Sequence, residues 1–506
     1  MRLGLWQLPL GCGEAMNNNT PLILAIDEGT SNAKAVLVNE RGQVIARGSR
    51  PLSVSHPQAG FSEQDPLFIW HSTLAAMQDC LAQVDRPITA LAISNQRESV
   101  VAWDRRTGEP LSPCISWQCR RSTALCTQLH AQGHEALILE KTGLALDPMF
   151  SAGKWRWILD HLDNGHARAA AGEICLGTVD SWLLWQLSGG QVFATDYSNA
   201  ARTQLFNLHA CAWDPQLLDL FAIPLAALAP IQASAGFFAQ TVALGGLPAG
   251  VPIMSMIGDS HAALYGQGGF APGLVKATLG TGSSLMTPMS GAIASTHGLS
   301  TTLAWHDGVK PTFAMEGNIV HTGAAVQWAS RLVAGDSLDA LTEQAAQLPD
   351  NGGVYFVPAL SGLGAPHWQA DARGLICGLT EATSGAHILR ASLESIAYQI
   401  RDVFEAMQQD IGHPLQELWV DGGATRNRWL MQFLANLLQR PVVRSLSPEV
   451  SALGAAHLAG RALGVWASDA ALEQLERQRE RFEPQDDPTM AGRYTEWKKA
   501  LARTLL

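Results

Sequence analysis

Short apolar runs that end in acids, glycines and hydroxyl residues recur along the chain and predict β-strands that lead into loops. Residues 22–26 are Leu-Ile-Leu-Ala-Ile, and residues 27–31 are Asp-Glu-Gly-Thr-Ser. Two further apolar runs, 35–38 and 43–46, flank a turn-like Asn-Glu-Arg-Gly sequence. This pattern predicts a β-hairpin whose first loop presents an acid and hydroxyls.

The same order of strand, acid, glycine, hydroxyl and strand returns in the middle of the chain. An apolar run from residue 253 ends in Gly-Asp at 258–259, which predicts a buried strand that delivers the Asp259 carboxylate to an open edge. A second strand, from residue 276, breaks into Gly-Thr-Gly-Ser-Ser at 280–284, a loop rich in backbone N–H groups and hydroxyls that suit a phosphate. One such hairpin alone would favour an ordinary structural turn, but two copies favour chemistry at a phosphoryl group.

Longer patterns predict helices and a second half built like the first. Residues 71–83 and 387–407 carry apolar residues at helical spacing, and residues 90–94, 354–358 and 418–421 are strand-like. The last of these runs into glycines and a helix from Asn427, whose N-terminus suits the phosphates or ribose of a nucleotide. No low-complexity linker separates the halves, which favours a packed cleft.

Length and composition narrow the function class. A chain of 506 residues predicts two large domains, at 21–270 and 271–506, after a disordered leader at 1–20 in which Met16 is an alternative start to Met1. The net charge of −11 argues against a nucleic-acid partner and for a small neutral or metal-complexed ligand. The eight Cys form no C-x-x-C pair, and no apolar run reaches membrane length. We therefore expect a cytoplasmic protein without a zinc site or membrane partner.

Two polar segments add candidate acceptor-binding residues. Arg97 and Glu98 follow the strand at 90–94, where they would form either a surface ion pair or a donor–acceptor fork for the vicinal hydroxyls of a polyol. Trp117, in a Trp-Gln-Cys-Arg-Arg string, is either a core residue or an apolar wall against a carbon chain.

Taken together these strings resemble the FGGY carbohydrate kinases, with the glycerol kinase branch nearest. The resemblance rests on residues 27–30, 95–98, 117–121, 258–259 and 280–282, and it extends to the two family signatures at 149–161 and 374–394. It implies an α/β fold of two actin/hexokinase-like (ribonuclease H-like) domains with the active site in the interdomain cleft. It also implies ATP- and Mg²⁺-dependent phosphorylation of a hydroxyl of a small polyol or sugar, and a homo-oligomer, either a dimer or a tetramer.

The resemblance also assigns roles. Asp259 would be the general base, which at an ordinary aspartate pKa near ~3.9 is a weak one, and Asp27 would help to hold Mg²⁺. The nucleotide would be bound by a set of loop and helix residues: Thr30, Ser31, Lys34, Gly280, Thr281, Gly323, Gln327, Gly423 and Asn427. The acceptor would be held by residues from both halves: Arg97, Glu98, Trp117, Met149, Asp259, Ser260 and Ser284.

Four of these positions depart from the glycerol kinase pattern. Lys34 stands where Arg is usual, which keeps the charge but loses a bidentate fork. Met149 replaces Tyr, Ser260 replaces Gln, and Ser284 replaces Phe. The last change removes an apolar wall and leaves room and a hydroxyl, which predicts an acceptor larger than glycerol, such as erythritol, xylulose or ribulose. The alternative is that neighbouring residues refill the space and glycerol remains the substrate.

Two other function classes fit the sequence less well. A non-catalytic actin-like ATPase or sugar-sensing regulator would keep the nucleotide hairpins but would not need Asp259 beside Arg97, Glu98 and Trp117. A dinucleotide dehydrogenase is disfavoured because Gly-Gln-Gly-Gly at 266–269 lacks the motif spacing and acidic partner of a dinucleotide site.

Overall fold

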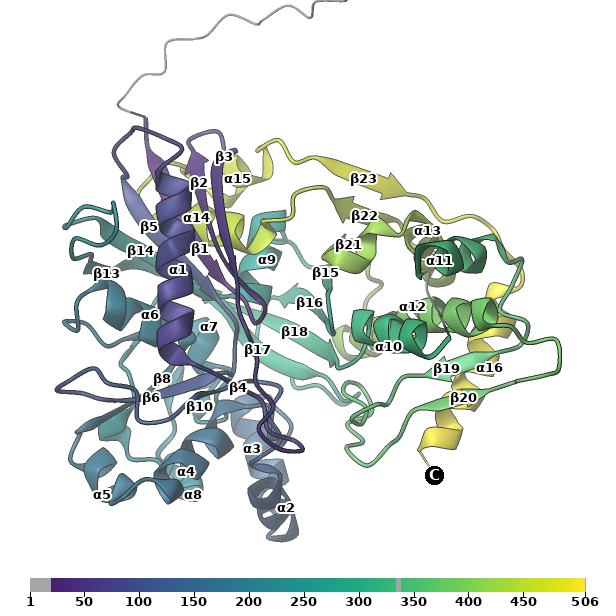
Figure 1. Ribbon diagram of the computed structural model, residues 1–506, viewed down its shortest axis with the longest axis horizontal. Coiled ribbons are helices and arrows are strands. Elements are labelled where there is room, and N and C mark those ends of the chain that lie inside the picture. The colour runs from purple at the N-terminus through teal and green to yellow at the C-terminus, as the bar shows by residue number, and fades with distance from the viewer. Residues whose placement is uncertain (1–19, 334–337, 506) are drawn as a thin grey trace, which may run out of the picture.

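Two β-sheets, one from each half of the chain, dominate the structure (Figure 1). The structure is a computed structural model that describes residues 20–333 and 338–505. The leader expected at 1–20 therefore lies outside the described residues, apart from Thr20. No helix in the described ranges is long and apolar enough to cross a membrane.

The first sheet carries the N-terminal hairpin and the strand that ends at Asp259. Its described strands, in spatial order, are β13 (Ala235–Gln240), β14 (Pro252–Gly258), β5 (Ala90–Asn95), β1 (Leu22–Glu28), β2 (Asn32–Asn39) and β3 (Val44–Pro51). The apolar runs form these strands because both faces of the sheet are covered: every residue of β1 and β5 is buried.

Parallel pairing brings three polar strand ends to one edge of this sheet. β1 pairs in parallel with β5, and β5 with β14, so that Glu28, Asn95 and Gly258 lie in register. Each of the three strands carries a residue of predicted function near this edge. Asp27 is on β1, Arg97 follows β5, and Asp259 follows β14. Ligands bind at this carboxyl edge in open α/β sheets.

The second sheet repeats this arrangement in the C-terminal half. Its described strands, in spatial order, are β17 (Ser300–His306), β18 (Pro311–Ile319), β16 (Ser283–Met289), β15 (Leu274–Leu279), β21 (Glu417–Asp421), β22 (Val442–Ser445) and β23 (Arg479–Phe482). β15 and β16 form the predicted hairpin around Gly280–Gly282, and β15 runs parallel to β21, with Thr278 opposite Asp421. The glycine loops after β15 and β21 are therefore neighbours.

Smaller sheets and helices complete the fold. The remaining strands are β4 (Glu63–Gln64), β7 (Cys114–Ile115), β6 (Val100–Asp104) and β8 (Ile174–Thr178) in one sheet, and the pairs β10 (Phe206–Asn207) with β11 (Ala212–Trp213), β12 (Ile231–Gln232) with β9 (Thr195–Asp196) and β19 (Tyr355–Val357) with β20 (Leu375–Cys377). The helices before the central stretch are α1 (Pro66–Leu81), α2 (Thr123–Ala131), α3 (Glu135–Thr142), α4 (Ser151–His161), α5 (Gly165–Ala170), α6 (Val179–Leu187), α7 (Tyr197–Ala200), α8 (Pro215–Phe221) and the 3₁₀ turn η1 (Leu225–Ala227). The later ones are α9 (Asp259–Gln267), α10 (Gly323–Val333), α11 (Leu338–Gln347), α12 (Gly385–Ile411), η2 (Gly423–Arg426), α13 (Arg428–Leu438), α14 (Val450–Ala462), α15 (Asp469–Glu473) and α16 (Met490–Thr504).

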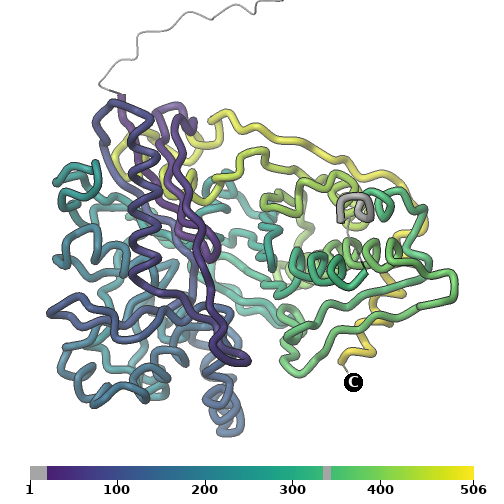
Figure 2. Tube along the Cα trace, viewed as in Figure 1, coloured from purple at the N-terminus to yellow at the C-terminus, as the bar shows by residue number. Residues whose placement is uncertain are grey.

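Helix α14 crosses back from the C-terminal half and covers the first sheet. It packs against α9 and against β1, β5 and β14, and Figure 2 shows this late segment lying among the N-terminal strands. Glycines allow the close approach: a Cβ on Gly454 would lie 1.8 Å from the carbonyl oxygen of Ala262. The two halves therefore share one apolar cluster, which includes Ile23, Ile257 and Leu458.

Two elements differ from the sequence prediction. Helix α1 begins at Pro66 rather than at residue 71, because Asp65 caps the Leu67 amide and proline suits the first turn. The charged composition of the last ~40 residues predicts helix and tail, yet this segment includes β23, an Arg-Glu-Arg-Phe strand at the edge of the second sheet. Charged residues are expected on an edge strand. Because β23 consists mostly of charged residues, the apolar pattern of the sequence did not indicate a strand there.

Candidate active site

A cavity of about 400 Å³ lies between the two sheets, at the polar strand ends. It is lined by eleven of the predicted site residues: Thr30, Ser31, Arg97, Glu98, Trp117, Met149, Asp259, Ser260, Gly280, Thr281 and Ser284. Val54, Asn318 and Val320 add apolar and amide surface that the sequence did not point to. The structure thus brings the predicted acceptor and phosphate residues to one space.

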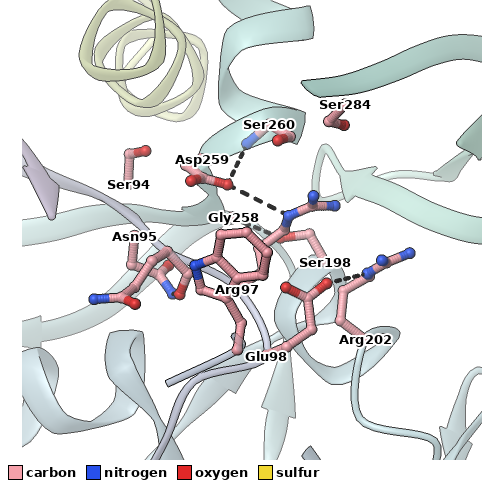
Figure 3. A network of polar contacts seen from close by, with 12 residues as sticks. Ser94, Asn95, Arg97, Glu98, Ser198, Arg202, Gly258, Asp259, Ser260 and Ser284 are labelled. Carbon is pink, nitrogen blue, oxygen red and sulfur yellow. Dashed lines mark hydrogen bonds and ion pairs between the residues drawn. The ribbon is translucent and has the colours of Figure 1, made fainter. Parts of the chain in front are cut away.

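Asp259 stands at the first position of α9, where β14 ends (Figure 3). Its Oδ1 accepts from the Ser260 amide at 2.6 Å and lies 3.3 Å from Nε of Arg97. The Gly258 amide donates to Ser198 Oγ at 2.9 Å, which fixes the turn before the helix. The carboxylate is therefore held in position, with 35% of its side chain open to the cavity.

The pKa of Asp259 is raised to about 6, above the ordinary aspartate value. Burial among protein atoms is the largest cause, although the side chain still borders the cavity. The Arg97 guanidinium opposes it and lowers the pKa, whereas the nearby charges of Asp27 and Glu98 raise it further. A higher pKa makes Asp259 a stronger base than a free aspartate.

This pKa predicts an acid limb in the rate profile. Asp259 must be ionised to accept a proton, so kcat/KM should fall about tenfold per pH unit below pH about 6. The measurement is kcat/KM for the acceptor from pH 8 to pH 5, with ADP binding followed over the same range as the control for loss of structure. A profile that stays flat down to pH 5, as a carboxylate with the ordinary pKa of ~4 would give, would contradict the raised pKa of Asp259.

Behind Asp259 lies a buried charge network that the sequence did not predict. Arg97 donates to both carboxylate oxygens of Glu316, at 3.0 and 2.7 Å. Arg202 lies 2.7 Å from Glu316 and donates to Glu98 at 2.6 Å (Figure 3 shows the Glu98–Arg202 pair). Burial by itself raises the pKa of Glu316, but Arg202 and Arg97 together hold it well below its usual range. The signal in the sequence was a single acid inside the apolar strand β18.

This network orients the acceptor residues. Ser284 Oγ donates to Glu316 Oε1 at 2.7 Å, so the proton of the hydroxyl that the sequence places here is engaged by Glu316. Glu98 has a left-handed backbone, with φ of 61°, and its carbonyl accepts from Ser151 at 3.2 Å and from Lys154 at 3.0 Å. Arg97 and Glu98 are both buried and are paired with Glu316 and Arg202 rather than with each other, so they do not form a surface ion pair.

Trp117 joins the acceptor side of the cavity to the N-terminal hairpin. Its indole N–H donates to Thr30 Oγ1 at 2.9 Å, and its backbone amide donates to Ser99 Oγ at 3.0 Å. Trp117, Thr30 and Met149 all line the cavity. Trp117 is thus a wall of the cavity rather than a core residue.

The loop Gly280–Gly282 forms the opposite wall. The Gly280 amide donates within the loop to the Gly282 carbonyl at 3.0 Å, so this amide is not available to a phosphate. The amide of Gly323, at the start of α10, donates to the Gly280 carbonyl at 3.0 Å. A Cβ on Gly323 would lie 2.5 Å from that carbonyl oxygen, so only glycine permits this contact.

Asp27 and Lys34 lie just outside the cavity wall, across the β1–β2 register. Their side chains form an ion pair at 3.8 Å, and Ser94 Oγ donates to Asp27 at 3.1 Å. Beside them, burial raises the pKa of Glu28 well above its usual value, and the charges of Asp27 and Asp259 raise it further. Within the described ranges no group of three or more acids, histidines or cysteines is placed to hold a metal ion, so a divalent cation here would need Asp27 together with the phosphates of a ligand.

The remaining nucleotide candidates lie on helices and turns of the C-terminal half and do not line the cavity. Gly423 follows β21, and no atom lies within 4 Å of the position that a Cβ would take there. Gln327 is exposed on α10. Asn427 caps α13 by accepting from the Leu430 amide at 3.0 Å. Gly423 thus leaves open space beside the Gly280 loop.

Comparisons with known proteins find similar sequences and structures over nearly the whole chain. Residues 22–266 match the N-terminal domain, and residues 275–463 the C-terminal domain, of the FGGY family of carbohydrate kinases. An apulose kinase of Pectobacterium atrosepticum is 52% identical over 491 residues, covering 96% of this chain and 99% of that protein. A glycerol kinase of Stenotrophomonas maltophilia (strain R551-3) is 47% identical over 496 residues, covering 96% and 98%. The crystal structure of Plasmodium falciparum glycerol kinase with ADP superposes with a TM-score of 0.88 at 32% identity, covering 96% and 99%.

Proposed function

The chain belongs to the FGGY family of carbohydrate kinases, and we propose that it phosphorylates a four- or five-carbon polyol or ketose with Asp259 as the general base. The observation that carries the proposal is that Asp259 and the small residue Ser284 line the same cavity. The high identity to an apulose kinase favours a ketose larger than glycerol. The glycerol kinases among the relatives keep glycerol as the second candidate.

Phosphoryl transfer requires an aligned oxygen, neutralised charge and exclusion of water more than covalent help from the protein. Asp259 would accept the proton of the attacking hydroxyl as its oxygen commits to phosphorus. Arg97 and Glu98 would grip neighbouring hydroxyls, since each terminal nitrogen of Arg97 has a second N–H beyond the one given to Glu316. Trp117 would lie against the carbon chain.

FGGY kinases use ATP, and we propose that the phosphates lie between the two hairpin loops. Thr30 and Ser31 would approach them from one side and Gly280 and Thr281 from the other, because all four residues border the cavity. The adenine side of the nucleotide would extend toward Gly323, Gln327, Gly423 and Asn427. Asp27 would hold Mg²⁺, which supplies charge neutralisation at the phosphates when bound, and Lys34 would orient that carboxylate.

An ADP-release assay with ATP and Mg²⁺ over glycerol, erythritol, ribitol, xylulose, ribulose and apulose tests the acceptor. We expect the highest kcat/KM for a five-carbon ketose, with apulose the first to measure. A clear preference for glycerol over all the others would overturn the larger-acceptor proposal and leave the kinase assignment intact.

Replacement of Ser284 by Phe is expected to restore a glycerol-sized space. The ring would fill the room that Ser284 leaves, so KM for the preferred ketose should rise at least tenfold while KM for glycerol changes little. Ser284→Ala is the matched control, because it loses the hydrogen bond to Glu316 without filling the space. Equal losses for all acceptors in Ser284→Phe would show that the substitution acts on the Glu316 network and not on acceptor size.

A further inference from the structure

A second cavity of about 400 Å³ lies at the far end of α9 from Asp259. It is bounded by the turn between β2 and β3, by Gly266 and Gln267 at the end of α9, by the loop before α14, and by residues 475–479. Among the described residues, the two cavities share no lining residue. At 1.5 Å per residue, α9 separates its two ends by about 13 Å. The second cavity is therefore a separate space with the volume of a small-ligand site.

Its charge is opposite to that of the protein as a whole. Arg47, Arg477 and Arg479 line it, against one lining acid, Glu476, whereas the chain has a net charge of −11. Arg47 is also paired with Glu449 at 3.1 Å. A cavity with this excess of guanidinium groups attracts an anion.

Arg477 and Arg479 donate to carbonyl groups in the last turn of α9 and still have N–H groups that these hydrogen bonds do not use. Nε of Arg477 donates to the Gly266 carbonyl at 3.0 Å, and Arg479 donates to the Gln267 carbonyl. Capping the helix accounts for these bonds. It does not account for Nη2 of Arg477, which is buried and has no hydrogen-bond partner among the described residues.

His457 on α14 is a second unsatisfied group in the same cavity. His457 is 2% exposed and lines the cavity. Neither of its ring nitrogens has a hydrogen-bond partner within the described part of the chain. Burial and the neighbouring Arg477 charge lower the pKa of His457 to about 3, so the ring is neutral and offers one N–H donor and one acceptor. Buried polar atoms in native proteins nearly always have partners, so this one calls for a ligand or water.

We propose that this second cavity binds a small anion that carries a phosphate group. The guanidinium groups of Arg477 and Arg479 and the His457 ring supply donors of the kind that phosphate oxygens accept, and Ser445 and Ser447 add hydroxyls to the lining. Apolar residues of the lining, Val44, Leu446 and Leu453, would contact the carbon part of an organic phosphate. A bound anion would contact the residues that cap α9, the helix whose first residue is Asp259.

Isothermal titration calorimetry with inorganic phosphate tests the site directly. A non-hydrolysable ATP analogue with Mg²⁺ is kept saturating, so that the phosphate positions of the active site are occupied. We expect one phosphate bound per chain. Glycerol 3-phosphate in a parallel titration identifies the source: equal affinity indicates free phosphate as the ligand, and tighter binding of the ester indicates an organic phosphate.

Two substitutions link that binding to the cavity. Arg479→Gln removes one charge, and His457→Phe keeps a ring of similar shape against Trp466 while removing the nitrogens. Each should weaken phosphate binding at least tenfold, the loss expected for one charge-assisted or buried hydrogen bond. Arg481→Gln is the matched control: it removes the same charge from β23, but Arg481 pairs with Glu417 and Glu483 and does not line the cavity.

Two outcomes would overturn the proposal of a phosphate site. The proposal is overturned if wild-type protein binds no phosphate up to ~10 mM under these conditions. It is also overturned if Arg479→Gln and His457→Phe bind phosphate as tightly as Arg481→Gln does. Thermal unfolding of each variant establishes that a loss of binding does not reflect a loss of fold, and the wild-type stoichiometry decides the question if a variant proves unstable.

Discussion

Replacing Asp259 with Asn should reduce phosphoryl transfer by at least ~10³-fold while ADP still binds. The amide keeps the size of the carboxylate but cannot accept the hydroxyl proton, and Asp259 is held at the cavity wall by Ser260 and Arg97. The nucleotide candidates lie on other elements, namely the loops after β1, β15 and β21, strand β2 and helix α10. The measurements are kcat by ADP release at saturating acceptor and the dissociation constant of ADP by calorimetry.

Asp486→Asn is the matched control, because Asp486 is an exposed aspartate on the C-terminal segment. It should leave both kcat and ADP affinity unchanged. If Asp259→Asn retains wild-type turnover, Asp259 is not the base. If it loses ADP binding as well as turnover, the substitution has disturbed the cleft and the assignment would have to rest on the pH profile.

Removing the carboxyl group of Glu316 is expected to be the most destabilising single change near the site. Glu316 is fully buried and faces Arg97 and Arg202, which are 6% and 0% exposed. Glu316→Ala would leave two buried guanidinium groups without their shared partner, and breaking a buried pair in this way costs about 3–5 kcal/mol. The variant should melt several degrees below the wild type and should show a raised KM for the acceptor, since Arg97 would lose its orientation.

Glu417→Ala provides the comparison for Glu316→Ala. Glu417 also pairs with an arginine, Arg481, but its side chain is 30% exposed. Exposed ion pairs contribute about 0–1 kcal/mol, so this variant should melt close to the wild type. Comparable melting temperatures for the two variants would mean that the Glu316 network relaxes without cost. That result would remove it as the support of the acceptor site.

The parts of the site that were predictable from sequence are those that lie at strand ends. An apolar run that stops at Gly-Asp marks the position of Asp259, and parallel pairing then places it beside Arg97 without any further information. The residues that could not be predicted are joined through space. Arg202 and Glu316 are 114 positions apart, and only the folded chain brings them to the same carboxylate cluster.

The pKa of Asp259 and the hydrogen bonding of Ser284 could not be predicted from the sequence either. The residue type of Asp259 predicts an ordinary carboxylate, whereas its pKa of about 6 comes from the depth of α9 between two sheets. The sequence places a hydroxyl at Ser284 but does not give its partner, because the hydrogen bond to Glu316 depends on the pairing of β16 with β18. Sequence patterns give the location of such groups but not the neighbours that set their behaviour.

The return of α14 to the first sheet has a consequence for how the protein is made. A ribosome completes β14 at residue 258, but the helix that covers the sheet spans residues 450–462. Until then the apolar face that includes Ile23, Val36 and Ile257 has no cover from α14. At ~5–20 residues per second this delay amounts to roughly 10–40 s, during which exposed apolar surface is open to aggregation or to a chaperone. A nascent chain released at residue 270 would carry all of its N-terminal strands and still lack the helix that buries them.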